Sequence, residues 1–488
     1  MREGNDFPIA IIGAGFAGIG AAIQLLRAGI DSFTIFERAS EIGGTWRDAT
    51  YPGAACDVPS HVYSLSFEPN PDWSRRHASS WEIQEYLLKV VDKWNLRQHM
   101  RLSTEIVEAR FDEDSGTWIL ATDAGDRFSA RVVLAGVGGL VDPAYPNIDG
   151  MDEFAGDMMH TARWNHGVDL VGKRVAVIGT GASAVQVVPA IASIVSLLAV
   201  FQRTPAWVVP KLDRIYPAWR RKLFARFPLL LWASRLAKYW LSELRGPIVF
   251  LDSKVLSRIG TWISMWNLRK QVQDPELREK LTPSFQFGCK RVLVSDDYWA
   301  TFERSNVALV TDPIDAVERT GVRTKDGTLH EADAIVLATG YKLGLATAPF
   351  PVIGRAGRTL EETWKCGAVA YKGLSVAGFP NWFIMMGPNT GPGHTSVLVY
   401  TEAQISHALQ AIRKIMTENL KYMDVRQEVQ DRYNDGIQNR MKQMVWSGCK
   451  SWYLSEDGSN HSLYPGFAAE YVVRTRTLRA ADYEVGQF

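Results

Sequence analysis

Short apolar segments, each followed by a glycine-rich turn and a stretch of helical spacing, occur twice along the chain. The first unit begins with the apolar run Pro8–Ile12, enters the turn GAGFAG and ends in a second apolar run, Phe33–Phe36. The second unit begins with Arg174–Ile178, passes through GTGASA and ends in Leu197–Phe201. Continuous apolar runs of this length are typical of buried strands. The pattern therefore predicts two strand–turn–helix–strand units.

Both turns carry the glycine spacing of a Rossmann-like, dinucleotide-binding fold. In the first, Gly13 permits the tight turn, Gly15 lets the backbone approach a pyrophosphate, and Gly18 allows the helix to pack closely on the strand. One such motif is weak evidence, but two in matching context predict an α/β protein with two dinucleotide-binding domains. The positions expected to contact the two cofactors are Gly13, Gly15, Phe16 and Gly18 in the first turn and Gly179, Thr180, Gly181, Ala182, Ser183 and Ala184 in the second.

Charge distinguishes the two expected sites. Glu37 and Arg203 hold equivalent positions, 24 residues after Gly13 and Gly179, respectively. A carboxylate accepts hydrogen bonds from ribose hydroxyls but repels a 2′-phosphate, so the first site is expected to hold FAD or NAD. A guanidinium makes bidentate bonds to a phosphate, so the second site is expected to prefer NADPH over NADH. An FAD domain interrupted by an NADPH domain is an arrangement for electron transfer.

Internal similarity extends beyond the two turns. The segment FDEDSGTWILATDAGDRFSARVVLAGVG from Phe111 resembles VERTGVRTKDGTLHEADAIVLATGY from Val317, and each predicts hairpins followed by a buried strand that ends in small residues. The prolines of Asp142–Gly150 indicate a crossing between domains, and the chain is expected to return to the first domain after Gly340. We predict a discontinuous FAD domain (1–145 and 331–488) and an NADPH domain (146–330) with a helical insertion at about 210–285.

Composition narrows the function classes. The 54 Lys and Arg residues nearly balance 53 Asp and Glu residues, giving a net charge of +1, so nucleic-acid binding is not expected. The absence of a CxxC pair argues against a zinc site, a redox dithiol or a secreted disulfide framework, and for a reducing compartment. The four cysteines are Cys56, Cys289, Cys366 and Cys449.

The apolar segments also bear on location. None approaches the roughly 18 consecutive apolar residues that a membrane span needs, and no basic-then-apolar leader precedes the first strand. A cytoplasmic protein without an integral membrane segment is therefore expected. The region Tyr216–Trp240 mixes Arg and Lys with Leu, Phe and Trp at helical spacing. Contact with a membrane surface and packing of a helix on its own domain both fit this region, and the second is favoured.

Several segments carry a resemblance to one family. FAGDMMHTARW, Phe154–Trp164, resembles the FxGxxxHxxxW fingerprint of Baeyer–Villiger monooxygenases, although Asn165 follows where the family commonly has Pro or Asp. GGTWRDATYPGAACD, Gly43–Asp57, resembles a second family pattern, with Ala55 where many members carry Arg. GCKRVLVSDDYW, Gly288–Trp299, and the later segments FPNWFIMMGPNTGPGHTS and GCKSWYL fit as well. The resemblance spans nearly the whole chain.

The resemblance implies an enzyme that uses FAD, NADPH and O2 to insert one oxygen atom beside the carbonyl of a small ketone, through a C4a-peroxyflavin anion, giving an ester or lactone. An anionic peroxide attacks a carbonyl, whereas a protonated one delivers oxygen to sulfides or amines. A guanidinium favours the anion because its pKa of roughly 12 or higher keeps it charged. Arg291 is therefore the expected catalytic cation, and Asp57 is expected to orient it and offset its charge.

The resemblance also implies further contacts. His160 is expected to be a hinge histidine that bonds backbone rather than an acid–base catalyst, with Trp164 packed in the same linker. Two alternatives stay open: an N- or S-oxygenating flavin-containing monooxygenase, and a flavoprotein that only passes electrons. The oligomeric state is not predicted. The remaining expected contacts are Gly44, Thr45, Trp46, Asp57, Tyr63, Ile106 and Asn389 for FAD, and Thr204, Lys290 and Trp452 for NADPH.

Overall fold

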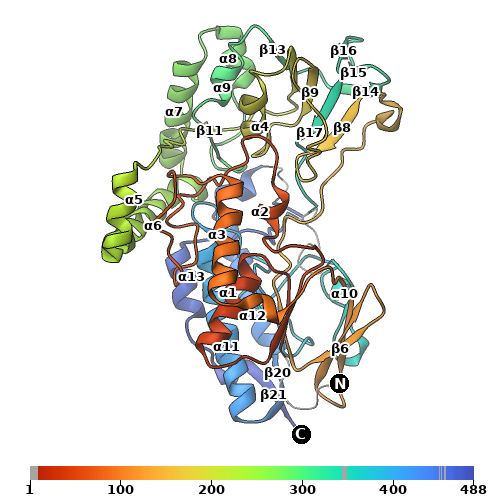
Figure 1. Cartoon of the computed structure of the whole chain (residues 1–488), viewed down its shortest axis with the longest axis vertical. Helices are drawn as coiled ribbons and strands as arrows, with labels where there is room; N and C mark the ends of the chain where they lie inside the picture. Colours follow the sequence, from red (N-terminus) through yellow and green to blue (C-terminus); the bar gives the residue numbers. More distant parts are fainter. Residues whose placement is uncertain (1–8, 343–348, 450, 452, 456–457) are drawn as a thin grey trace.

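The computed structural model describes residues 9–342, 349–449, 451, 453–455 and 458–488, and Trp452 lies outside them. Two lobes are visible, each built around a five-stranded parallel sheet (Figure 1). The sheet in the lower lobe has the order β19-β7-β1-β2-β3. Its strands are β1 (Ile9–Ile12), β2 (Phe33–Phe36), β3 (Met100–Arg101), β7 (Val132–Ala135) and β19 (Trp382–Ile384).

The apolar runs of this sheet have a simple explanation. Successive side chains of a strand point to opposite faces, and in β1 both faces are covered. Ile9 and Ile11 belong to the core beneath α1 (Phe16–Arg27) and α11 (Val397–Thr417), which pack on each other. Ala10 and Ile12 belong to a second core on the opposite face. A strand buried on both sides needs apolar residues at every position.

The upper sheet repeats the lower one. Its order is β13-β10-β9-β17-β8, and all its pairings are parallel. The strand–turn–helix units match, with β9, α4 and β10 corresponding to β1, α1 and β2, so the predicted pair of Rossmann-like folds is confirmed. The elements are β8 (Asp157–His160), β9 (Arg174–Ile178), α4 (Ala184–Ile191), β10 (Leu197–Phe201), β13 (Val307–Val310) and β17 (Ala334–Leu337).

Antiparallel sheets follow each lobe's first strands, as the internal similarity predicted. β4 (Ile106–Asp112), β5 (Thr117–Thr122) and β6 (Arg127–Ala130) form consecutive hairpins, joined at one edge by β18 (Val352–Ile353). The counterpart in the second lobe is β14 (Ile314–Glu318), β15 (Gly321–Thr324) and β16 (Leu329–Glu331). Each set precedes a buried parallel strand, β7 or β17.

The predicted domain boundary at residue 330 is too early. β17 lies beyond it and is an inner strand of the second sheet, because the apolar run Ala334–Leu337 is the counterpart of β7. The chain leaves the second lobe at Gly340, where its carbonyl accepts from the amide of Ala144 at 2.9 Å. The segment Phe154–Trp164, expected to be a linker, contributes the edge strand β8.

The region expected to be a helical insertion contains α5 (Ala218–Arg226), α6 (Pro228–Phe250), α7 (Lys254–Gln271) and α8 (Pro275–Leu281). α5 and α6 project from one side of the molecule (Figure 1). The remaining elements longer than three residues or paired in sheets are α2 (Thr45–Asp48), α3 (Ser80–Lys93), β11 (Val208–Val209), β12 (Leu293–Val294), α9 (Tyr298–Thr301), α10 (Leu360–Thr363), β20 (Leu420–Val425), α12 (Gln427–Met441), α13 (Ala468–Thr475) and β21 (Tyr483–Gln487), with short 3-10 turns at Leu96–His99 and Val445–Gly448.

The cysteines depart from expectation. Cys289 and Cys449 form a disulfide, whereas Cys56 is a buried free thiol and Cys366 an exposed one. The absence of a CxxC pair argued against a disulfide framework, but it could not reveal this bond, because the two partners are 160 residues apart and only the tertiary fold brings them together.

Candidate active site between the two domains

The first glycine turn is built for close backbone approach. Gly13 has a φ of 97°, and a Cβ there would lie 2.6 Å from the carbonyl oxygen of Gly136. A Cβ on Gly18 would lie 1.9 Å from the carbonyl oxygen of Gly13, so the helix can meet the strand only without a side chain. A Cβ on Gly15 would meet only the Cα of Gly44, at 3.9 Å. The open side of Gly15 therefore suits a pyrophosphate at the beginning of α1.

Glu37 holds this turn in place. Its buried carboxylate accepts hydrogen bonds from the amides of Ala14 (2.8 Å) and Ala39 (3.0 Å). Arg47, which the sequence did not single out, donates to the same carboxylate at 3.0 Å. A carboxylate has about four acceptor positions, so one remains for a ribose hydroxyl. The residues present fit the adenosine end of FAD.

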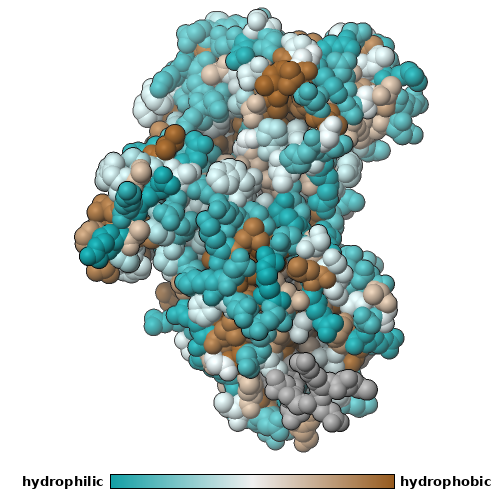
Figure 2. Space-filling view, in the orientation of Figure 1, coloured by the Kyte–Doolittle hydropathy of each residue, from teal (hydrophilic) through white to brown (hydrophobic). Residues whose placement is uncertain are grey.

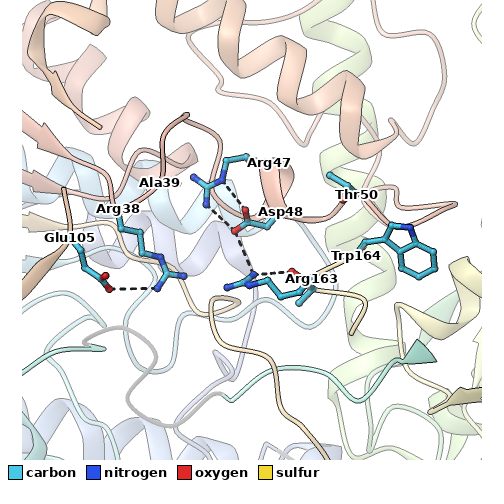
Figure 3. A pocket seen from close by; sticks show the side chains of 9 residues that line it. Arg38, Ala39, Arg47, Asp48, Thr50, Glu105, Arg163 and Trp164 are labelled. Carbon is cyan, nitrogen blue, oxygen red and sulfur yellow. Dashed lines mark hydrogen bonds and ion pairs between the residues drawn. The ribbon is translucent and has the colours of Figure 1, made fainter. Parts of the chain in front are cut away.

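A cavity of about 560 Å³ opens beside these groups (Figure 3). Asp48 accepts two hydrogen bonds from Arg47, at 2.8 and 2.9 Å, and lies 4.0 Å from Arg163. In Figure 3 the guanidinium of Arg163 points toward Asp48, whereas the ring of Trp164 lies away from that pair. A charged cavity of this size suits a polar ligand. It is lined by Arg38, Ala39, Arg47, Asp48, Thr50, Glu105, Ala162, Arg163 and Trp164.

The second glycine turn has the same design. Gly179 has a φ of 119°, and a Cβ there would lie 2.4 Å from the carbonyl oxygen of Ala338 in the neighbouring strand connection. A Cβ on Gly181 would meet nothing within 4 Å, and Ala182 is exposed. The beginning of α4 is therefore accessible to a phosphate at Ser183, whereas Ala184, the next expected contact, is buried.

The end of β10 supplies the charge expected for NADPH. The hydroxyl of Thr180 donates to the carbonyl of Thr204 at 2.9 Å, which joins the turn to the segment that carries Arg203. Arg203 is exposed there. Lys290, the other expected phosphate contact, is half-buried with its ammonium 4.8 Å from the centre of the Phe285 ring. Arg203 and Thr204 lie together, while Lys290 comes from the segment that carries Arg291.

The two domains are bridged by a residue that the sequence did not single out. The side-chain amide of Gln186, on α4, donates to the carbonyl of Ala55 at 2.9 Å. Its oxygen accepts from the hydroxyl of Tyr51 at 2.7 Å and from the amide of Ala55 at 3.4 Å. Gly53, with a φ of 81°, lies against the same helix, because a Cβ there would be 2.5 Å from the carbonyl oxygen of Gln186. Ala55 thus contacts the second domain through its backbone.

Asp57 and Arg291 meet as the sequence predicted, although 234 positions separate them. Arg291 Nη2 lies 2.5 Å from Asp57 Oδ2. The charge of Asp57 outweighs burial and raises the pKa of Arg291 above its ordinary value. Burial raises the pKa of Asp57, but the charge and hydrogen bond of Arg291, helped by Lys211, lower it overall. The pair is therefore fully ionised, and 48% of the Arg291 side-chain surface remains exposed.

Three side chains near this ion pair are neutral. Burial raises the pKa of Cys56 and of Tyr63, so both stay protonated. Burial also raises the pKa of Tyr453 to about 12, against the influence of Arg291. The hydroxyl of Tyr63 accepts from the indole nitrogen of Trp46 at 3.1 Å. These neighbours leave Asp57 as the main counter-charge to Arg291.

Comparison with known proteins decides the family. A Baeyer–Villiger monooxygenase from Pseudomonas aeruginosa is 43% identical over 486 residues, which cover 98% of this chain and 91% of that protein. The chain belongs to the Baeyer–Villiger monooxygenase family. Residues 10–216 match the family model described as pyridine nucleotide-disulphide oxidoreductase, which covers the two glycine turns.

Solved structures agree with this assignment to the Baeyer–Villiger monooxygenase family. Cyclohexanone monooxygenase from Rhodococcus sp. Phi1 bound to NADP+ has a TM-score of 0.89 at 28% identity, covering 99% of this chain and 100% of that one. OTEMO in complex with FAD and NADP has a TM-score of 0.89 at 26% identity, with the same coverage. The predicted family, monooxygenase activity and cofactors, FAD and NADPH, are thereby confirmed. The alternative of a flavoprotein that only passes electrons is not supported.

Several expected FAD contacts of this monooxygenase are structural residues. Phe16 and Trp46 each meet the ring of Tyr63 edge-on at 5.4 Å, so the side chain of Phe16 belongs to the core. Ile106 is likewise buried in the core beside β1 and β2. Gly44, with a φ of 56°, and Thr45 begin α2. The side chains of Phe16 and Ile106 thus pack in the core, and their contact with FAD stays a prediction.

Asn389 and His160 hold loops of the monooxygenase. The side-chain amide of Asn389 donates to the carbonyls of Asn460 (2.7 Å) and Leu463 (2.9 Å). Its buried oxygen has no hydrogen-bond partner among the described residues, which leaves an acceptor for a bound cofactor. His160 accepts from the amide of Ala162 at 3.0 Å, and burial lowers its pKa to about 4. A neutral, backbone-bonded histidine fits the expected structural role.

Proposed function

We propose that this chain binds FAD at its first glycine turn and NADPH at its second, and inserts one atom of O2 beside the carbonyl of a small ketone. The ketone becomes an ester or lactone, NADPH and a proton supply the reducing equivalents, and the second oxygen atom leaves as water. The observation that carries the proposal is the 2.5 Å contact between Arg291 Nη2 and Asp57 Oδ2.

Arg291 and Asp57 have distinct roles in this proposal. Bound FAD, once reduced by NADPH, supplies the activated oxygen. Arg291 stabilises negative charge on oxygen and cannot surrender a proton, because Asp57 raises its pKa further. Asp57 holds the guanidinium in one orientation. A preorganised charge of this kind contributes about 3–4 kcal/mol to the transition state, or a factor of about 10² to 10³ in rate.

In this proposal, Arg203, Thr204 and Lys290 select NADPH over NADH. Arg203 and Thr204 stand at the end of β10, opposite the open side of the second turn. A guanidinium there makes bidentate bonds to a 2′-phosphate. Lys290 adds a second positive charge from the segment that carries Arg291, which ties recognition of NADPH to the reacting centre.

The test is isotopically labelled O2 with a panel of small ketones and mass analysis of the products. We expect one labelled oxygen in an ester or lactone. Arg291→Ala is expected to retain FAD and to accept hydride from NADPH, while ester formation falls by about 10²- to 10³-fold. Arg127→Ala, an exposed arginine on β6, is the matched control and should leave both steps unchanged.

Two results would contradict the proposal. Labelled sulfoxide or N-oxide without any ester would assign the chemistry to soft nucleophiles. Consumption of NADPH that is insensitive to every ketone and yields only hydrogen peroxide would remove oxygen insertion altogether.

A further inference from the structure

The projecting helices α5 and α6 expose an unusual set of side chains. More than half of the large hydrophobic side chains that are well exposed, among the described residues, fall between Leu212 and Trp266. Figure 2 shows hydrophobic residues beside hydrophilic ones on the outer end of this projection. We call this end the α5–α6 tip. Its hydrophobic members are Trp219 (66% exposed), Phe227 (51%), Leu229 (81%), Leu230 (45%) and Trp232 (59%).

The tip lies in the most basic stretch of the chain. Between Arg214 and Gln273 only two acidic residues occur, Glu243 and Asp252, although the whole chain is nearly neutral. Glu243 is buried and bonded to His394 at 3.0 Å, and Asp252 accepts from Gln286 at 3.0 Å, so neither carboxylate serves the tip. The twelve basic residues are Arg214, Arg220, Arg221, Lys222, Arg226, Arg235, Lys238, Arg245, Lys254, Arg258, Arg269 and Lys270.

The inner side of α6 explains why the outer side is free. Arg235 donates to the carbonyls of His61 (2.7 Å) and Ser64 (3.0 Å), which fastens α6 to the first domain. The expectation that this region packs on its own protein is therefore correct for one side of the helix. On α5, Lys222 and Arg226 are exposed and close in sequence to the tip's aromatic and aliphatic residues. Burial within this chain does not account for those residues.

We propose that the α5–α6 tip docks on an anionic lipid surface. Tryptophan is favoured at the interface between headgroups and acyl chains, leucine and phenylalanine enter the outer acyl region, and Lys and Arg meet lipid phosphates. Docking on the surface, rather than spanning, agrees with the helices themselves, because none of those in the described ranges is long and apolar enough to cross a bilayer.

Charge favours a lipid surface over a second copy of this chain. A symmetric contact between two copies brings the same patch of each against the other. At the tip, such a contact would place Lys222 and Arg226 near the same residues of the second copy, with no carboxylate from this stretch to offset them. An anionic bilayer offers opposite charge and apolar depth in one surface.

The test is cosedimentation of the FAD-loaded protein with phosphatidylcholine vesicles, with and without about a quarter of phosphatidylglycerol. We expect binding to the anionic vesicles that weakens with added salt, and little binding to the neutral ones. Lys222→Gln and Arg226→Gln should each weaken binding about fivefold. Leu229→Glu should weaken it at least about tenfold, because it removes an apolar anchor and adds a repelled charge.

Two control variants test whether vesicle binding depends on the α5–α6 tip. Val473→Glu, at a residue 72% exposed on α13, and Arg127→Gln should bind vesicles like the unchanged protein. All variants should oxidise NADPH with a water-dissolved ketone at the same rate, since the altered side chains are exposed. Failure to bind anionic vesicles, or equal binding by the tip variants, would overturn the proposal. So would sedimentation analysis in which Leu229→Glu dissociates an oligomer while vesicle binding is absent.

Discussion

If Asp57 acts only through Arg291, then removing both side chains should be no worse than removing Arg291 alone. The contact that motivates this prediction is the 2.5 Å bond between Asp57 Oδ2 and Arg291 Nη2, beside the neutral side chains of Cys56 and Tyr453. Asp57→Asn keeps the shape of the side chain and removes the charge that raises the pKa of Arg291. The guanidinium then stays protonated but is held less firmly.

The structure sets the size of each effect. A hydrogen bond to a charged group contributes about 1.5–3 kcal/mol, so Asp57→Asn should slow ester formation about 10- to 150-fold. Loss of the charge itself in Arg291→Ala should cost about 10²- to 10³-fold. The double variant should match Arg291→Ala within a factor of about two, giving a coupling energy nearly as large as the effect of Asp57→Asn.

The assay follows two steps separately. Anaerobic bleaching of the flavin by NADPH reports hydride transfer, and product analysis under single-turnover conditions reports oxygen insertion. The predicted non-additivity belongs to the second step. Multiplicative losses in the double variant, at either step, would refute the reasoning, because they would show that Asp57 contributes independently of Arg291.

Three further outcomes are expected. Arg203→Ala should raise the KM for NADPH at least about tenfold and leave NADH nearly unchanged, since one charge-assisted bond to a phosphate is lost; equal loss with both nucleotides would disprove the 2′-phosphate role. Burial, then the charge of Lys372, lowers the pKa of His407 to about 4. The neutral histidine therefore stabilises the fold above about pH 6.5, and roughly 2 kcal/mol of unfolding free energy should disappear between pH 7.5 and 5; urea titrations should show a flatter pH dependence for His407→Gln. Dithiothreitol and Cys449→Ser should each lower the melting temperature, because the crosslink restricts the unfolded chain, whereas Cys366→Ser should not.

The glycine turns could be predicted from sequence because their requirements are local. Gly13 needs its φ of 97°, and Gly18 needs the absence of a Cβ, whatever surrounds the turn. The equal spacing to Glu37 and Arg203 follows from the same unit being used twice. Parallel strands buried on both faces can likewise be recognised in the sequence as unbroken apolar runs.

Contacts between distant segments left no such local signal. Nothing in the sequence distinguishes Arg47 from an arginine at the surface, yet it donates a hydrogen bond to the carboxylate of Glu37. Gln186 lies on a helix whose pattern predicts burial, not a bridge to Tyr51 and Ala55. The Asp57–Arg291 pair was accessible only through resemblance to a family, because no spacing rule connects residues 234 positions apart.

The ion pair also joins the two domains, and this has a consequence for catalysis. Asp57 belongs to the first domain, whereas Arg291 lies two residues before β12, which pairs with β11 in the second. The two crossings lie side by side, since the amide of Lys342 donates to the carbonyl of Asp142 at 2.9 Å. The Asp57–Arg291 contact and the bonds of Gln186 to Tyr51 and Ala55 both span the two domains. The orientation of the proposed catalytic guanidinium therefore depends on the arrangement of the domains, so Gln186→Ala, which removes the second set of bonds, should slow the oxygen-insertion step that we propose for Arg291.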